Sequence, residues 1–417
     1  MRITNVEVFV AGLSRTGGGG PNCPVVKITT DEAGLVGWGN GALSGGEQAV
    51  ATLIEQHLAP RLIGADPDRV EDIWQMFQRS TYWRAGRVLA GATAAIDIAL
   101  WDIKGKRAGL PLYSLLGGKC REKLLTYAHA SGGTIEETVA SVLANRERGY
   151  RAIRAQVATP GYESGSYGAG GARRAGGGGG HPADVDEHPA RRVRTWEPTP
   201  YLRTAPALFE RLRAEVGDTV ELLHDVHDRL TPIQAAHLAR ELEPYHLFFL
   251  EDPIPVENKD GLRVLREHTT TPIAIGERYS SKYDCLPAIT GQLIDYVRNG
   301  MSKSGGLTEL RKIAALAEPF QVKTAFQGPA DIGPLAFAAT VHLDLAIPNF
   351  GIQEDPHFSG EVREVFQGLP EWADGYYTAS ERPGLGVEVD EAVLRERPYH
   401  PFFFPVIRRE DGTLQDP

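Results

Sequence analysis

The sequence has few cysteines, no excess of positive charge and no long apolar run. Its only cysteines, Cys23, Cys120 and Cys285, are far apart and lack metal-ligand spacing, which argues against a disulfide framework and favours a reducing cytoplasm. The formal net charge is −10. Because phosphate backbones are held by basic surfaces, we do not expect a nucleic-acid partner. No apolar stretch is long enough to cross a bilayer, so we do not expect a membrane protein either.

The first part of the chain predicts a small α+β unit. VEVFV and PVVKITT alternate like strands on either side of the glycines at 17–20, which indicates a hairpin with a long loop. Apolar residues recur at helical spacing from Gly46 and again from Val70. The stretch from Ala90 to Gly118 begins nearly apolar on all sides, which is typical of a buried helix.

From Leu124 onward, short apolar strands alternate with helical segments. We predict eight strands: LLTYAHA, YRAIRAQ, VELLHDV, HLFFLED, PIAIGER, LIDYVRN, QVKTAFQ and NFGIQED. This alternation is typical of a parallel α/β barrel of the (β/α)8 type. A Gly-, Arg- and Pro-rich insertion at about 159–201 interrupts it, and is either a disordered linker or a lid that orders with substrate. From about Gly384 the sequence is again typical of strands, and we expect this segment to pack on the first domain.

Three acidic residues follow successive predicted strands: Asp225 in LLHDVHD, Glu251 in FFLEDP and Glu277 in AIGERY. Each lies 26 residues after the one before, about one strand-helix unit, so we expect all three at the same height at the carboxyl end of the barrel. Like charges that converge need a counter-ion, and oxygen ligands indicate Mg²⁺ first, with Mn²⁺ or Ca²⁺ less favoured. The alternative is that each acid is an ordinary surface residue or forms its own salt bridge.

Two histidines flank Asp225. His227 follows it by two residues, so strand alternation predicts that both side chains share a face, whereas His224 points the other way and packs.

The segments AIDIALWDIKGK, GLPLYSLLGG, HDVHDRLTPIQAAHLARELEPYHLFFLEDP, TTTPIAIGE, LIDYVRN and NFGIQED resemble the enolase superfamily, and within it the mannonate dehydratase subgroup. The resemblance implies a TIM-type barrel at 121–383, an N-terminal α+β capping domain at 1–120, and a C-terminal segment at 384–417 that completes the cap. It also implies a homo-oligomer and a carbon-oxygen lyase that acts on a small-molecule acid sugar with Mg²⁺, or Mn²⁺, as cofactor.

The resemblance further assigns roles to residues. Asp225, Glu251 and Glu277 would hold the metal, and His227 would protonate the departing hydroxyl, with a supporting contact to the metal ligands as its alternative. Arg154 would work beside a tyrosine base, for which Tyr167 is the first candidate and Tyr162 the second. Residues that match substrate contacts are His129, Arg298 and Glu354, and for Arg298 a structural ion pair is equally expected.

The sequence departs from the subgroup at two further positions. Gln327 stands where the subgroup has a seventh-strand histidine, and an amide cannot exchange protons at neutral pH, which excludes two-base racemisation. Ser44 replaces a subgroup asparagine. We therefore expect a sugar-acid dehydratase that gives a 2-keto-3-deoxy acid, in which Gln327 contacts substrate. The alternatives are epimerisation or another elimination on a different carboxylate, and a metal-binding protein with negligible turnover.

Overall fold

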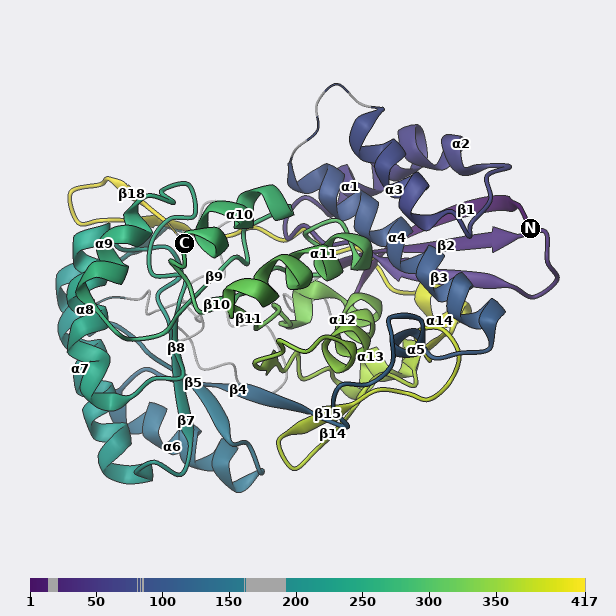
Figure 1. The fold of residues 1–417 in the computed structure, drawn as a ribbon. Helices are drawn as coiled ribbons and strands as arrows, with labels where there is room; N and C mark the ends of the chain where they lie inside the picture. Colours follow the sequence, from purple (N-terminus) through teal and green to yellow (C-terminus); the bar gives the residue numbers. More distant parts are fainter. Residues whose placement is uncertain are drawn as a thin grey trace.

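The computed structural model of the protein describes residues 1–13, 22–80, 82, 84, 86–160, 162 and 193–416. The chain begins with an antiparallel sheet of β1 (Ile3–Gly12), β2 (Asn22–Thr30) and β3 (Val36–Asn40), in that order. This confirms the predicted hairpin, whose glycine run at 17–20 lies outside the described residues. Helices α1 (Glu47–Leu53), α2 (Ala59–Leu62), α3 (Val70–Arg79) and α4 (Arg87–Ala108) follow and lie at one end of the molecule (Figure 1).

Helix α4 is the buried helix that the sequence predicts, and it packs directly on β3. A Cβ atom at Gly37 would lie 2.1 Å from the carbonyl oxygen of Ala99, and one at Gly39 would lie 2.1 Å from that of Ala95. No side chain fits at these positions, so the glycines let the helix backbone approach the strand. The close contact explains why α4 is buried over most of its length.

The rest of the chain forms a closed parallel barrel. All eight predicted strands are present as β4 (Leu124–Gly132), β5 (Ala152–Val157), β7 (Glu221–Asp225), β8 (Phe249–Glu251), β9 (Ile273–Ile275), β10 (Tyr296–Val297), β11 (Lys323–Thr324) and β12 (Gln353–Glu354). They pair in this order from β4 to β11, and β12 pairs with β4. The fold is therefore the expected (β/α)8 barrel with an N-terminal cap.

The barrel closes between β11 and β12 at a narrow seam. The amide of Thr324 donates to the carbonyl of Asn349 at 2.9 Å, and the Thr324 carbonyl accepts from the amides of Gly351 and Ile352 at 2.8 and 3.4 Å. The described backbone hydrogen bonds across this seam therefore join one residue of β11 to residues 349–352, the segment that leads into β12.

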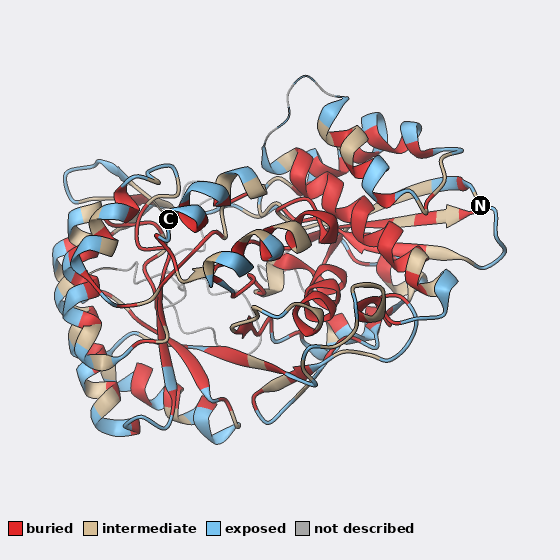
Figure 2. Cartoon of the chain, in the orientation of Figure 1, coloured by how far each residue is buried: buried red, intermediate tan, exposed pale blue. Residues whose placement is uncertain are grey.

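Helices surround the strands with their buried faces inward and exposed residues on the outside (Figure 2). They are α5 (Leu112–Leu115), α6 (Ile135–Glu147), α7 (Pro198–Val216), α8 (Pro232–Leu242), α9 (Gly261–His268), α10 (Lys282–Thr290), α11 (Leu307–Ala317), α12 (Pro334–Ala346) and α13 (Gly360–Val365). Among the described helices, none combines the length and apolar character that spanning a bilayer requires. The predicted insertion at 159–201 extends too far, because Trp196, just before α7, and Tyr201, in its first turn, are buried in the core.

The C-terminal segment contains β13 (Phe366–Gln367), β14 (Glu371–Ala373), β15 (Tyr376–Thr378), β16 (Glu388–Val389), α14 (Glu391–Arg395), β17 (Val406–Arg408) and β18 (Leu414–Gln415). Helix α14 contacts the first domain, where Glu391 accepts from Lys27 Nζ at 2.6 Å. The end of the segment differs from the expectation, because β17 pairs with β6 (Val193–Thr195) on the barrel side of the molecule (Figure 1). The predicted domain boundaries themselves stay a prediction.

Candidate active site

The inward-facing side chains of the barrel form two layers of opposite character. The lower layer is apolar and consists of Tyr127, Ala152, Leu223, Phe249, Ala274, Ala325 and Ile352, with Tyr296 packed against it. Because alternate residues of a strand face the same side, the inward position two residues later gives the upper layer. On seven strands that position is polar: His129, Arg154, Asp225, Glu251, Arg298, Gln327 and Glu354. The sequence therefore places a ring of polar groups at the carboxyl end of the barrel.

The three predicted metal ligands do not share one height. Asp225 and Glu251 are direct partners in the pairing of β7 with β8. Glu251 pairs with Ala274, so the next inward position on β9 is Gly276, and Glu277 comes one residue later. The Glu277 side chain is accordingly 18% exposed, whereas that of Glu251 is fully buried. Equal spacing along the chain does not reveal this offset in register between neighbouring strands, which is a property of closed barrels.

A fourth carboxylate joins the group, and the sequence analysis missed it. Glu251, Asp252 and Glu277 each offer an oxygen, and these atoms all lie within 4.8 Å of one another. Asp225 is not part of this compact trio. The signal for Asp252 was its place directly after Glu251 in LEDP.

Several carboxylate oxygens at this end of the barrel lack a partner. Asp225 Oδ1, Glu251 Oε2 and Asp252 Oδ2 are buried and accept no hydrogen bond from the described residues. Buried anionic oxygens without donors are costly unless a cation meets them. A donor set made only of carboxylate oxygens fits a hard divalent cation such as Mg²⁺.

Two buried arginines neutralise part of this negative charge. Arg154 Nη1 lies 2.9 Å from Glu251 Oε1 and 3.2 Å from Asp225 Oδ2. Arg298 Nη2 lies 2.5 Å from Glu251 Oε1 and 3.3 Å from Glu354 Oε2. Although burial opposes ionisation, the Arg154 guanidinium holds the pKa of Asp225 below its usual range.

On the opposite side of the ring, Glu354 is held by several donors. It accepts from Gly328 N at 3.0 Å and lies 2.8 Å from His129 Nε2. Burial opposes its ionisation, but Arg298 and His129 hold the pKa of Glu354 well below its usual range. Because the Arg298 side chain is 0% exposed, its contacts favour the structural ion pair over a direct contact with substrate.

His227 lies beside a candidate metal ligand, but not through the predicted strand alternation. Strand β7 ends at Asp225, and both His227 and Asp228 have φ 61°. Strand alternation therefore does not explain its direction, and the left-handed backbone costs about 1–2 kcal/mol per residue. The turn brings His227 Nε2 to 3.8 Å from Glu277 Oε1. His224 packs as expected, between the Tyr201 hydroxyl at 2.7 Å and the Ala155 carbonyl at 2.9 Å.

The structure tests only one of the two candidate tyrosine bases. Tyr167 lies outside the described residues. The Tyr162 hydroxyl donates to Glu410 Oε1 at 2.7 Å, and this hydrogen bond raises the pKa of Tyr162. A proton-abstracting phenolate needs the opposite shift, so the contact disfavours Tyr162 as the base.

Residues 137–393 match the protein family described as "Enolase C-terminal domain-like". Residues 11–117 match the family described as "Mandelate racemase / muconate lactonizing enzyme, N-terminal domain". The chain belongs to the enolase superfamily. A D-galactonate dehydratase family member of Streptomyces bingchenggensis is 48% identical over 99% of this chain and 97% of its own length. A D-mannonate dehydratase of Caulobacter sp. (strain K31) is 47% identical over 95% and 96%. The crystal structure of an enolase from Pantoea ananatis with bound D-gluconate and Mg has a TM-score of 0.88 and 41% identity, with each chain fully covered.

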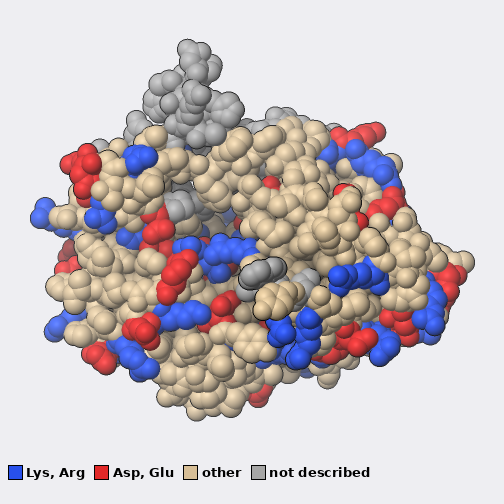
Figure 3. Space-filling view, turned by 90° about the horizontal axis from the view of Figure 1, so that it is seen from above, with Lys and Arg blue, Asp and Glu red and all other residues tan. Residues whose placement is uncertain are grey.

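The two positions at which we expect a departure from the mannonate dehydratase subgroup have defined contacts. Gln327 Nε2 donates to Glu277 Oε2 at 2.9 Å, so the amide supports a candidate metal ligand. Ser44 Oγ donates to Asp331 Oδ2 at 2.9 Å. The predicted substrate contact of Gln327 stays a prediction. On the face seen in Figure 3, basic side chains are interspersed with acidic ones.

Proposed function

We propose that this chain is a Mg²⁺-dependent dehydratase of a sugar acid, a hydro-lyase that converts an aldonate to a 2-keto-3-deoxy acid and water. The observation that carries the proposal is the ring of carboxylates and two arginines at the carboxyl end of the barrel, with three buried carboxylate oxygens that lack a partner. The superfamily membership and the dehydratase names of relatives more than 45% identical support the same reaction class. The D-gluconate and Mg in the similar crystal structure support the ligand classes.

We assign the metal to Asp225, Glu251 and Glu277, with Mn²⁺ as an alternative ion. Asp225 and Glu251 flank the same guanidinium atom of Arg154, so their carboxylates face one space. Asp252 Oδ1 instead accepts from Gly276 N at 3.2 Å, which favours a supporting position. When bound, Mg²⁺ would stabilise the negative charge that develops on the substrate carboxylate as the neighbouring proton leaves.

The remaining roles belong to side chains that move protons. Tyr167 is proposed to take the proton from the carbon next to the carboxylate, and the positive charge of Arg154 would favour its phenolate form. His227 gives a proton to the hydroxyl on the following carbon, which leaves as water. The resulting enol gains a proton at that carbon, loses the proton of its own hydroxyl and becomes the 2-keto-3-deoxy acid. His129, Gln327 and Glu354 are proposed to contact the hydroxyls of the substrate.

The test is a panel of aldonates that includes D-mannonate, D-gluconate and D-galactonate, incubated with the purified chain in D₂O. We expect Mg²⁺-dependent formation of a 2-keto-3-deoxy acid that carries solvent deuterium at carbon 3. EDTA and Asp225→Asn should each abolish it. A protein that binds Mg²⁺ but turns over no sugar acid would refute the dehydratase and favour the binding role that the substitution at Gln327 allows.

We further propose that the chain works in the cytoplasm as a homo-oligomer. Three free cysteines support a reducing compartment. Tyr283 and Leu286, 69% and 40% exposed and about one turn apart on α10, support association with another copy. Light scattering after size exclusion should give a multiple of the chain mass, and Tyr283→Glu should reduce it.

A further inference from the structure

The last residues of the chain form a hairpin at the barrel. β17 and β18 pair antiparallel, and β17 also pairs in parallel with β6. In Figure 1, β18 lies at the opposite end of the molecule from the N-terminus, and Gln415 of β18 contacts Arg229 in the loop after β7. The C-terminal hairpin, residues 406–415, therefore belongs to the catalytic end of the molecule, although α14 just before it contacts the first domain.

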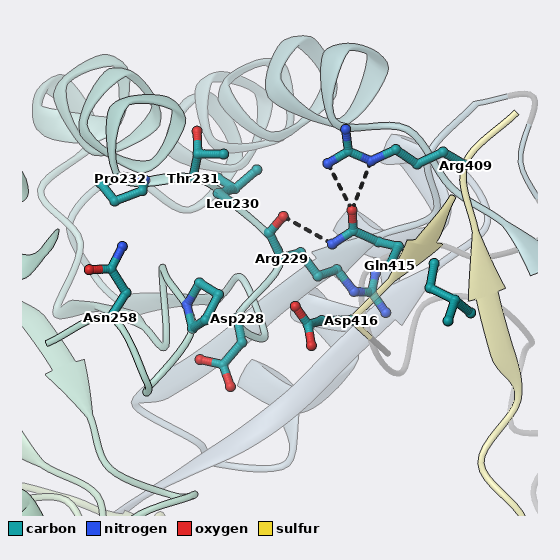
Figure 4. Close-up of a pocket in the computed structure, with 11 residues that line it drawn as sticks. Asp228, Arg229, Leu230, Thr231, Pro232, Asn258, Arg409, Gln415 and Asp416 are labelled. Atoms are coloured by element: carbon teal, nitrogen blue, oxygen red, sulfur yellow. Dashed lines mark hydrogen bonds between the residues drawn. The ribbon is translucent and has the colours of Figure 1, made fainter. Parts of the chain in front are cut away.

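A hydrogen-bonded relay connects this hairpin to the loop after β7. Arg409 donates from Nε and Nη2 to Gln415 Oε1, at 3.1 and 3.0 Å. These two donors fix the orientation of the amide, because only its oxygen can accept them. Gln415 Nε2 then donates to the backbone carbonyl of Arg229 at 3.3 Å (Figure 4). A pocket of about 310 Å³ lies between the hairpin and the loop.

The loop that Gln415 contacts carries His227. Two consecutive residues of this loop, His227 and Asp228, are in the left-handed region, and such backbone persists only where surrounding contacts hold it. On one side, Asp228 N donates to the Asp252 carbonyl at 2.7 Å, and Arg278 Nη1 donates to Asp228 Oδ2 at 2.6 Å. On the other side, the hairpin holds the carbonyl of Arg229.

The hairpin also supports the neighbouring core. Trp196 N donates to the Arg408 carbonyl at 2.9 Å, and the buried Trp196 ring lies 5.4 Å from the Arg229 guanidinium. The same ring packs 5.5 Å from Tyr201, whose hydroxyl contacts His224 on β7. The side chain and the backbone of Arg229 are thus both fixed by elements that depend on β17.

We infer that the C-terminal hairpin positions His227 for proton transfer, through the contact of Gln415 with Arg229. This inference rests on the proposed role of His227 as the acid. A proton donor must lie within hydrogen-bond reach of the leaving hydroxyl, and a displacement of about 1 Å can cost about a hundredfold in rate. Gln415 touches neither the carboxylate ring nor the arginines in it, so it is a positioning residue.

The deciding variant is Gln415→Glu, which keeps the acceptor for Arg409 and loses the donor to the Arg229 carbonyl. We expect kcat for sugar-acid dehydration to fall at least about tenfold, with KM and Mg²⁺ affinity unchanged within about twofold. Gln415→Ala, which adds no charge, should lower kcat in the same direction. The matched control is Asp411→Asn in the hairpin turn, where the side chain caps Thr413 N at 2.8 Å and should leave kcat unchanged.

A second measurement separates the inference from the proposed function. In ¹³C-histidine-labelled protein, the His227 resonance, assigned by its loss in His227→Asn, should shift or broaden in Gln415→Glu but not in Asp411→Asn. An unchanged kcat and an unchanged His227 resonance in Gln415→Glu would overturn the inference. If the unsubstituted protein turned over no sugar acid, the proposed function would fail, and the resonance would still decide whether the hairpin holds His227.

Discussion

Replacing Arg298 by methionine should destabilise the protein strongly, and Mg²⁺ should restore part of the loss. Arg298 is fully buried and contacts Glu251, Glu354 and the Tyr127 hydroxyl, the last at 2.7 Å. Methionine fills much of the space but leaves two buried carboxylates without this counter-charge. Breaking a buried ion pair by removing one partner costs about 3–5 kcal/mol, so we expect that loss in EDTA.

The effect of the metal follows from the same charges. At a concentration one hundred times its Kd, a ligand stabilises the native state by about 2.7 kcal/mol. In Arg298→Met the cation also replaces a charged interaction worth about 1.5–3 kcal/mol, so the Mg²⁺-dependent gain should exceed that of the unsubstituted protein by about this amount.

Urea unfolding followed by tryptophan fluorescence, with EDTA or saturating Mg²⁺, measures both quantities. Arg69→Met is the control, because the Arg69–Asp72 pair is 66% and 65% exposed and should contribute no more than about 1 kcal/mol in either condition. A loss below about 1 kcal/mol in Arg298→Met, or an equal Mg²⁺ gain in both proteins, would refute the view that Arg298 balances the charge of the metal ligands.

Three further predictions follow from individual residues. Asp225→Asn should weaken Mg²⁺ binding by at least about a hundredfold and Asp252→Asn by about tenfold, as measured by calorimetry, because only the first removes a proposed ligand. Tyr167→Phe should abolish dehydration in the aldonate assay, whereas Tyr162→Phe should retain it, because the Tyr162 hydroxyl is engaged with the C-terminal segment. Burial lowers the pKa of His342 to about 4. Below pH 6.5, the ordinary histidine pKa, His342 therefore takes up a proton in the unfolded chain but not in the native state. The free energy of unfolding should fall by up to about 3 kcal/mol from pH 6.5 to 4, and His342→Asn should remove this pH dependence from urea unfolding.

Each of these has a contrary outcome. A larger effect in Asp252→Asn than in Asp225→Asn would move Asp252 into the ligand set. Loss of activity in Tyr162→Phe alone would make Tyr162 the base. If the free energy of unfolding of His342→Asn fell equally between pH 6.5 and 4, the decrease would belong to other titratable groups.

The sequence was enough to predict the barrel because its signal is local. Apolar strands, helical spacing and the acids at the strand ends are visible within segments of ten to thirty residues. Ala152 with Arg154, Leu223 with Asp225 and Phe249 with Glu251 repeat one pattern, in which an apolar inward residue is followed two positions later by a polar one. This pattern in the sequence is enough to locate these members of the polar ring at the carboxyl end of the barrel.

What the sequence missed depends on contacts between distant segments. The stagger of Glu277 comes from the register of β8 with β9, and the direction of His227 comes from a turn that the rest of the fold holds. The pairing of β17 with β6 joins segments about two hundred residues apart, and no periodicity reports it. Trp196 falls within the predicted insertion because the segment around it is rich in Gly, Arg and Pro, whereas tertiary packing buries it.

The dependence of the barrel seam on Thr324 has a mechanical consequence. Elsewhere in the ring, consecutive strands are joined by ladders, whereas the described backbone hydrogen bonds at the seam beside β11 all pass through the amide and carbonyl of Thr324. Local opening of the barrel should begin at this seam. The amide protons of Thr324 and Gly351 should therefore exchange with solvent sooner than those of β5 and β7. Gln327 and Glu354 follow the residues of this seam on either side. The most easily opened strand contact of the barrel therefore lies between two groups that we expect to contact substrate.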